Sequence, residues 1–288
     1  MKTEHNYFVA SRGRGGAGKF VRATAATAAR LFVENTRVYP WSFFAGRIVS
    51  SFFTIVLAYL IYTVLFEGQT AASFTTYTGT QNYLTFIVVG VGIMAYANGA
   101  LLGIGRSLII ERRIGTIDSL LLAPAPLPSF LVGVMLQAAL LTTLDFLIIL
   151  TLSLPFGADW ANANWLGFVL IVLVGHIGLL GMAVILAAVM LYLRDTYLTQ
   201  NTVIAVLYLI CGILFPIQYL PDWLQTLARF IPLTATVSLA RDNVLLGLDL
   251  GQHLDAILGL SILSLIYCAL GFILLNRVRR VALEKALS

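Results

Sequence analysis

Long apolar stretches alternate with short polar segments along the whole chain. Six of the stretches approach or exceed the roughly 20 residues that a helix needs to cross a bilayer core about 30 Å thick. Backbone groups must bond to one another in that core, so we expect each stretch to form a helix. The predicted spans are 44–66, 83–105, 127–155, 164–193, 196–217 and 256–276.

The composition supports an all-α integral membrane protein with six transmembrane helices. Hydrophobic residues make up 59% of the 288 residues and charged residues only 11%, whereas a soluble domain carries about 25% charge. Residues 41–288 are nearly used up by six spans and their loops. We therefore predict a single transmembrane domain and no soluble catalytic domain, so the chain is not expected to be an enzyme.

The basic residues predict the orientation. All but two of the 18 Lys and Arg residues fall on segments that share one side of the membrane if the chain crosses it six times. The exceptions, Arg229 and Arg241, lie between spans five and six. Because cytoplasmic loops carry the excess of Lys and Arg, we predict a multi-pass protein of the cell membrane with both termini cytoplasmic. The net charge of +5 follows from this asymmetry and requires no nucleic-acid partner.

Two segments outside the spans have patterns of their own. Residues 1–19 are rich in Gly and Arg and predict a flexible basic cytoplasmic tail. In residues 20–40 the side chains of Phe20, Thr24 and Leu31 share one helical face, with Arg residues elsewhere. A basic amphipathic helix just before a span is typical of the membrane interface.

The segment 219–250 predicts two short outer helices between spans five and six. Asp222 is a candidate cap for the first helix, and Pro232 separates it from the second. Apolar residues of the second helix repeat at helical spacing. Arg241 and Asp242 are expected to lie off that apolar face.

Asp145 is the one charged residue that the pattern places well inside a span. An intramembrane charge is costly and is a functional hypothesis by default. Asp145 could bind a cation or relay protons, or it could simply bond to a neighbouring helix. His176 in span four is the candidate partner, and both interpretations stay open.

Small residues recur at four-residue spacing in span two, at Ala95, Gly99 and Gly103. A second set, around His176, lies at Gly175, Gly178 and Gly181. Helix faces lined by small residues allow two helices to approach closely, so we expect close helix packing at both sets.

Other candidate chemistry is weak. Residues 13–20 nearly match a phosphate-binding loop, but Phe20 lacks the hydroxyl that would hold Mg²⁺. We therefore expect no ATP hydrolysis by the chain alone. Cys211 and Cys268 lie inside predicted spans without metal-type spacing and are expected to be reduced packing residues. No catalytic and no metal-binding residues are predicted.

Three features in order resemble the membrane subunit of ABC-2 type (type-2 ATP-binding-cassette) transporters, a group that includes drug, polysaccharide and nodulation-factor exporters. They are the amphipathic helix at 20–40, the loop at 106–126, and the outer segment with Pro216, Pro232 and Arg241. The resemblance implies that the loop is a coupling loop that contacts an ATPase. The implied coupling residues are Glu111, Arg112, Arg113, Gly115 and Thr116.

The resemblance also implies partners. A separate nucleotide-binding ATPase subunit would hold ATP and Mg²⁺, this chain would bind no cofactor, and a second permease copy, identical or related, would complete the path within membrane lipid. Spans one, two and five would line that path together with the intramembrane polar residues. The candidate path residues are Phe53, Tyr59, Asn98, Asp145, His176 and Tyr208.

The expected function is that of the permease subunit of an ATP-driven exporter. Few polar groups lie inside the spans, which favours an amphipathic substrate such as a drug, a lipid-linked molecule or a peptide, with a glycan as a further possibility. Two alternatives stay open. One is a proton-coupled secondary transporter that uses Asp145 and His176, and the other is a membrane assembly or immunity protein without a transport cycle.

Overall fold

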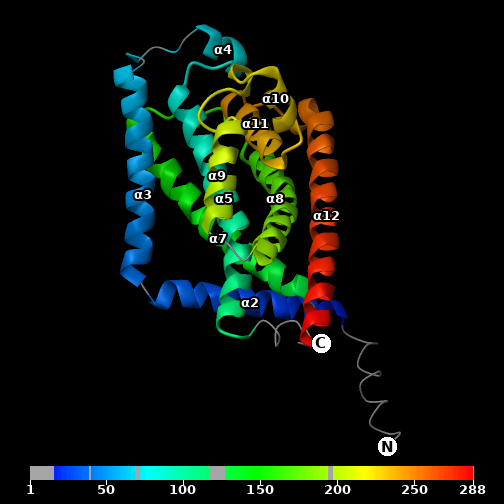
Figure 1. Ribbon diagram of the computed structural model, residues 1–288. Coiled ribbons are helices and arrows are strands. Elements are labelled where there is room, and N and C mark those ends of the chain that lie inside the picture. Colours follow the sequence, from blue (N-terminus) through cyan, green and yellow to red (C-terminus); the bar gives the residue numbers. More distant parts are fainter. Residues whose placement is uncertain are drawn as a thin grey trace, which may run out of the picture.

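The computed structural model describes residues 16–38, 40–65, 67–68, 70, 72–116, 127–193 and 197–287, and all regular structure among them is helical (Figure 1). The α-helices are α2 (Gly16–Val38), α3 (Pro40–Leu60), α4 (Ala72–Thr78), α5 (Tyr83–Arg113), α7 (Leu127–Ser153), α8 (Trp165–Leu193), α9 (Tyr197–Ile210), α10 (Asp222–Arg229), α11 (Pro232–Leu245) and α12 (Leu254–Leu287). Short helical turns are η1 (Ile61–Leu65), η2 (Leu154–Phe156), η3 (Ile217–Tyr219) and η4 (Leu250–His253).

Among the described residues, five helical segments are long and apolar enough to cross a membrane, and they coincide with five of the six predicted spans. They are Phe44–Val64, Tyr83–Glu111, Leu127–Phe156, Trp165–Met190 and Gly251–Arg277.

The predicted fifth span, 196–217, differs from the expectation. It contains α9, a helix of 14 residues, which at 1.5 Å per residue is about 21 Å long and shorter than the bilayer core. The helix ends at Ile210, and Gly212 then adopts a left-handed backbone conformation with φ of +67°. The stretch is continuous in hydropathy, but its glycine and Pro216 interrupt the helix.

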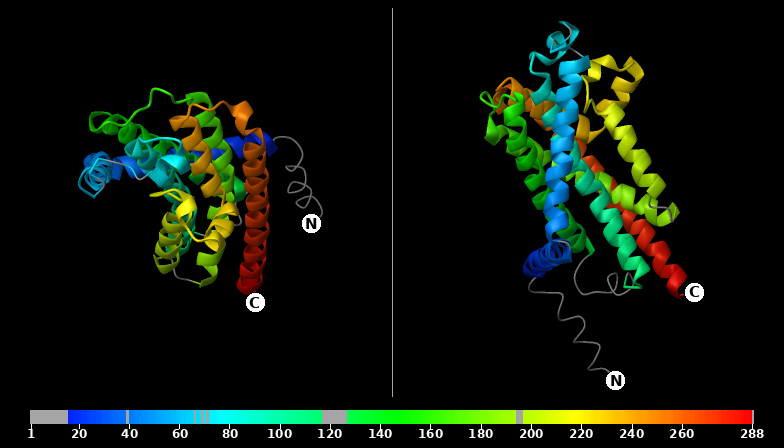
Figure 2. Two further views of the ribbon diagram at one scale, coloured as in Figure 1. Left: turned by 90° about the horizontal axis from the view of Figure 1, so that it is seen from above. Right: turned by 90° about the vertical axis from the view of Figure 1, so that its left-hand side faces the viewer.

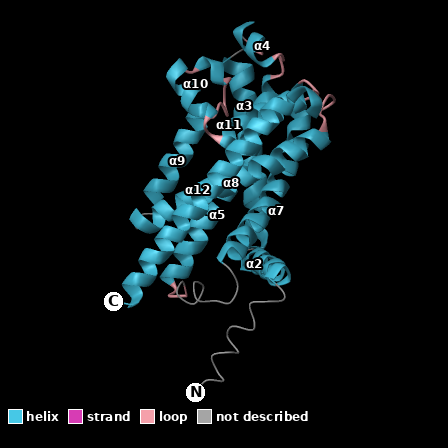
Figure 3. Ribbon diagram, turned by 90° about the vertical axis from the view of Figure 1, so that its right-hand side faces the viewer, coloured by secondary structure: helices cyan, strands magenta, loops and turns pink. Residues whose placement is uncertain are grey.

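Helix α5 forms the centre of the bundle. Its most apolar window is 72% buried, against 17% for the outermost helices, α3 and α12. It packs between α7 and α8, and α12 runs along α8. Figure 1 and the left view of Figure 2 show α3 and α12 at opposite edges of the bundle. Figure 3, seen from the α12 side, shows helices joined by loops.

Helix α2 crosses the end of the bundle at which α12 terminates (Figure 1). Its buried residues, Thr24 and Ala28, face the first turns of α7. A Cβ atom on Gly133 of α7 would lie 2.6 Å from the Cβ atom of Thr27, so the two helices cross closely. The helix begins at Gly16, before the predicted start at residue 20, because each residue added to a formed helix gains a backbone hydrogen bond.

The two predicted outer helices are α10 and α11. The break at Pro232 is confirmed, but Asp222 is not the cap. Pro221 precedes the helix, and Asp222 is its first residue. Most side chains of α11 are buried, because this helix is inserted among α5, α8 and α12.

The small-residue faces make the close helix contacts expected of them. A Cβ atom on Gly99 would lie 2.6 Å from Cγ2 of Thr142 on α7. A Cβ atom on Gly181 would collide with the backbone of Tyr267 and Cys268, so α8 and α12 touch backbone to backbone there.

We predict that Gly181→Ala lowers thermal stability, whereas Gly259→Ala on α12 does not. The alanine methyl at position 181 forces two backbones apart, and such overpacking costs about 1–3 kcal/mol. The same change at Gly259 meets nothing within 4 Å. Thermal unfolding of both purified variants in one detergent checks this, and equal midpoints would contradict the α8–α12 contact.

Candidate functional site

The end of α5 is tied to α2 by an ion pair. The Nη2 atom of Arg30 on α2 donates a hydrogen bond to Oε1 of Glu111 at 2.7 Å. The hydroxyl of Thr116 donates to the other carboxylate oxygen, Oε2. Glu111 is buried, so this predicted coupling residue faces its own chain.

A tight turn follows the ion pair. The N–H of Thr116 donates to the backbone carbonyl of Glu111 at 2.9 Å. Gly115 has φ of +74°, a conformation that favours glycine, and a Cβ atom there would meet nothing within 4 Å. Glycine is therefore favoured at position 115 by the backbone of the turn and not by a close neighbour within the described chain.

The residues at the tip of this turn are exposed. Arg113, Ile114, Gly115 and Thr116 all lie on the surface. Arg112 belongs to α5, but its side chain lies outside the described residues, as does the rest of the predicted loop at 117–126. The exposed tip can contact a partner, and the buried Glu111 can keep the tip in place.

Asp145 is paired with Arg47, not with His176. Oδ2 of Asp145 on α7 lies 2.5 Å from Nη1 of Arg47 on α3. The same nitrogen donates to the carbonyl of Leu141 at 3.1 Å. Arg47 lies inside the apolar segment Phe44–Val64, so an intramembrane cation and anion join α3 to α7.

His176 has a different environment. Its ring packs edge-on against Tyr96 of α5, with centroids 5.0 Å apart. Nδ1 of His176 and Oδ1 of Asn98 are both buried and have no described hydrogen-bond partner. The expected pairing of Asp145 with His176 was wrong, because α3 packs against α7 and places Arg47 beside the Asp145 carboxylate.

The aromatic path candidates lie on two different sides of the chain. Phe53 is exposed on α3, and the ring of Tyr59 on the same helix contacts Phe156 at 5.3 Å. Tyr208 on α9 packs against the main core formed by α5, α7, α8 and α11. A single copy of the chain therefore does not bring these residues together around one channel.

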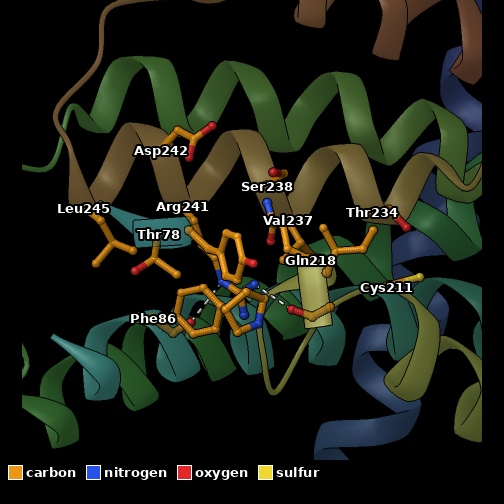
Figure 4. Close-up of a pocket in the computed structure, with 14 residues that line it drawn as sticks. Thr78, Phe86, Cys211, Gln218, Thr234, Val237, Ser238, Arg241, Asp242 and Leu245 are labelled. Atoms are coloured by element: carbon orange, nitrogen blue, oxygen red, sulfur yellow. Dashed lines mark hydrogen bonds between the residues drawn. The ribbon is translucent and has the colours of Figure 1, made fainter. Parts of the chain in front are cut away.

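A buried arginine lies near the other end of α5, away from the exposed turn at 113–116. Arg241 of α11 was expected off the apolar face, yet only 7% of it is exposed. It donates to three carbonyl oxygens: Nε to Phe86 at 3.1 Å, and Nη1 and Nη2 to Gly212 and Ile213, each at 2.6 Å (Figure 4). The guanidinium carbon also lies 3.5 Å from the centroid of the Phe86 ring.

Burial lowers the pKa of Arg241 to about 9, because the charged form loses its hydration. The guanidinium is still protonated at neutral pH. The neighbouring Asp242 points away from it in Figure 4, and burial raises the pKa of that carboxyl group. The sequence gives no clear signal for this site, because Asp242 and Asn243 follow Arg241 directly and make this part of α11 look solvent-facing.

The family model of the ABC-2 type transporter matches residues 39–245. The chain belongs to this family. The matched region extends from the start of α3 to the end of α11 and includes both ends of α5. A comparison with curated proteins finds no match.

Membership has a direct consequence for the role of the chain. An ABC-2 type transporter chain is the membrane component of an ABC transporter and not the ATPase. This is consistent with the expectation that the chain is not an enzyme. In the part of the chain that the structure describes, five apolar helices long enough to span a bilayer indicate a multi-pass membrane protein.

We predict that Asp145→Asn in this ABC-2 type transporter lowers thermal stability, and that adding Arg47→Gln restores part of the loss. The single change leaves a cation in an apolar segment without its anion. Removing one partner of a fully buried pair costs about 3–5 kcal/mol. We expect a smaller loss, about 1–3 kcal/mol, because each side chain here is 20% exposed.

The measurement is a double-mutant cycle on thermal unfolding in detergent. Asp222→Asn, at an exposed position on α10, is the control for removing a carboxylate elsewhere. Strictly additive effects at positions 47 and 145 would show that the two charges do not interact.

Proposed function

We propose that this chain is the permease subunit of an ATP-driven exporter for an amphipathic substrate. ATP and Mg²⁺ would be bound by a separate ATPase subunit and none by this chain. ATP binding would move the ATPase against the permease and shift the membrane cavity from inward to outward access. A ligand can shift such an equilibrium only by its difference in affinity for the two states.

The observation that carries the proposal is the construction of the α5 tip. The exposed turn at 113–116 is the part available to a partner, and it is held by the buried Glu111. Arg30 ties that carboxylate to α2. A push on the turn would therefore act on two helices and, through α5, on the centre of the bundle.

The path would be completed by a second permease copy. Most of α3 is uncovered in the single chain, with Phe52, Phe53 and Leu57 among its exposed side chains. Aromatic and aliphatic surfaces of this kind suit an amphipathic molecule better than an ion. A glycan is the second substrate class compatible with this reasoning, because aromatic rings such as the edge-on pair of Tyr59 and Phe156 could hold sugar faces.

The topology belongs to the same proposal. Helix α9 would serve as the short fifth of six spans, both termini would be cytoplasmic, and α2 would lie in the inner interface. In support of this placement, α2 buries Thr24 and Ala28 against the bundle and exposes Val21 and Val33 together with several cations. A basic amphipathic helix of this kind suits an anionic membrane surface.

The two rival functions have lost support. A proton-coupled carrier would have used Asp145 together with His176, but these residues contact Arg47 and Tyr96 instead. A membrane assembly protein without a transport cycle would gain nothing from a braced and exposed turn at the end of α5.

The experiment is co-purification of the tagged chain with its ATPase in nanodiscs, followed by ATP hydrolysis. We expect Arg113→Glu to lower capture of the ATPase and stimulated hydrolysis by roughly tenfold, because a reversed charge at an interface is repelled by the surface that attracted the original one. Thermal stability should not change, since Arg113 is exposed.

Glu111→Ala should reduce hydrolysis and also lower stability, since it removes the buried end of the α2–α5 tie. Glu34→Ala, an exposed acidic residue on α2, is the matched control. If no ATPase is captured by the wild-type chain, or if Arg113→Glu behaves like Glu34→Ala, the proposed coupling role of the turn is wrong.

A further inference from the structure

Helix α9 has few contacts with the rest of the chain along its length. Among its side chains that the structure describes, at 201–210, only Leu207 is buried, and Val206 and Leu209 are exposed. The residues just after the helix are different, because Cys211, Gly212 and Ile213 are all buried. The residues that follow α9 are thus anchored, while half of the described side chains along the helix are exposed.

The anchor is Arg241. Gly212 and Ile213 follow the last residue of α9, Ile210. Both residues are buried, so their carbonyl groups need a donor from elsewhere in the protein. Two nitrogens of Arg241 bond to the carbonyls of Gly212 and Ile213, and a third bonds to Phe86 on α5 (Figure 4). One side chain therefore joins α11, α5 and the end of α9.

The socket for this side chain is shaped by Gly90. A Cβ atom there would collide with Nη2 of Arg241 and would lie 2.5 Å from the carbonyl oxygen of Ile213. The Phe86 ring covers the guanidinium from one side. Both residues belong to the central helix α5, so the end of α9 is bound to the most buried element of the bundle.

The buried charge is stabilised by the dipoles of three carbonyl groups. The two ion pairs formed by the described residues involve Arg30 and Arg47, and neither involves Arg241. An uncharged replacement would leave buried carbonyl oxygens without their charged donor, and a buried acceptor that loses its partner is costly.

The neighbouring cavity is too small to make this a substrate site. It lies between α11 and the segment at 216–218 and has a volume of about 60 Å³, whereas ligand pockets measure roughly 300–1,000 Å³. The arrangement is therefore suited to holding chain segments together.

We propose that Arg241 is a positioning residue for transport: it fixes the outer end of α9 to α5 and α11, so that α9 turns about Gly212 while its far end moves. This inference rests on the proposed transport cycle, because the movement would be driven by the partner ATPase. Gly212 fits the pivot, since its φ of +67° lies in a region open to glycine.

Native Cys211, buried beside the pivot, reports on the anchor. In a Cys268→Ala background it is the one thiol of the chain, and its rate of modification by a small maleimide in nanodiscs measures opening of the anchor. We expect Arg241→Gln to raise the rate roughly tenfold or more, the factor that corresponds to losing one charged hydrogen bond. Arg241→Lys should raise it less, because it keeps the charge.

Arg229→Gln, at an exposed position on α10, is the matched control and should leave the rate unchanged. Gly90→Ala perturbs the socket without touching the charge and should also raise the rate, which keeps the test valid if Arg241→Gln does not fold. Equal Cys211 rates in the wild type, in Arg241→Lys and in Gly90→Ala would overturn the inference.

Nucleotide dependence separates a pivot from a purely structural contact. With the ATPase bound, a thiol at the far end of α9, introduced by Asn201→Cys in a Cys211→Ala and Cys268→Ala background, should react at different rates with and without ATP. Cys211 should not, unless Arg241 is replaced. If the thiol at position 201 reacts at the same rate with and without ATP while the ATPase is stimulated normally, the proposed pivot is wrong. If no ATPase is captured at all, the proposed function fails. The rates measured without nucleotide still decide whether Arg241 is the anchor.

Discussion

Backbone N–H and C=O groups that enter a hydrocarbon core must find their partners within the protein, and this requirement governs both the regular and the irregular parts of the chain. Where a helix is long enough, as in α5 and α8, the groups bond along the helix. Where α9 ends after 14 residues, the carbonyls that follow it need another donor. Arg241 supplies that donor from α11, which explains why a cation is tolerated among apolar helices.

Charged side chains of this transporter act as ties between segments that are distant in sequence. Arg47 and Asp145 join α3 to α7, Arg30 and Glu111 join α2 to α5, and Arg241 joins three segments through carbonyl oxygens. An uncompensated charge is costly when it is buried, so the contacts of Arg241 and of Arg47 with Asp145 strongly favour one arrangement of their helices. Arg30 contributes less, because 59% of its side chain is exposed.

Helix α5 connects the two sites that matter most for the proposed mechanism. Its first turns carry Phe86 and Gly90 of the arginine socket, and its last turn carries Glu111 beside the exposed tip. With 31 residues it is about 47 Å long at 1.5 Å per residue. A displacement at the tip would thus reach the anchor of α9 through one continuous and mostly buried helix.

The sequence by itself determined the helical class, five of the spans, the break at Pro232 and the close contacts at glycines such as Gly181, because hydropathy, proline geometry and side-chain size act locally. The tertiary structure decided which groups meet. The sequence allowed Asp145 to pair with His176, but the packing of α3 on α7 places Arg47 beside Asp145 instead. Glu111 faces inward because α2 lies across the end of α5. Arg241 is buried because α11 is surrounded by other helices and exposes few of its side chains. The periodicity of α11 alone does not show that these neighbouring helices cover it.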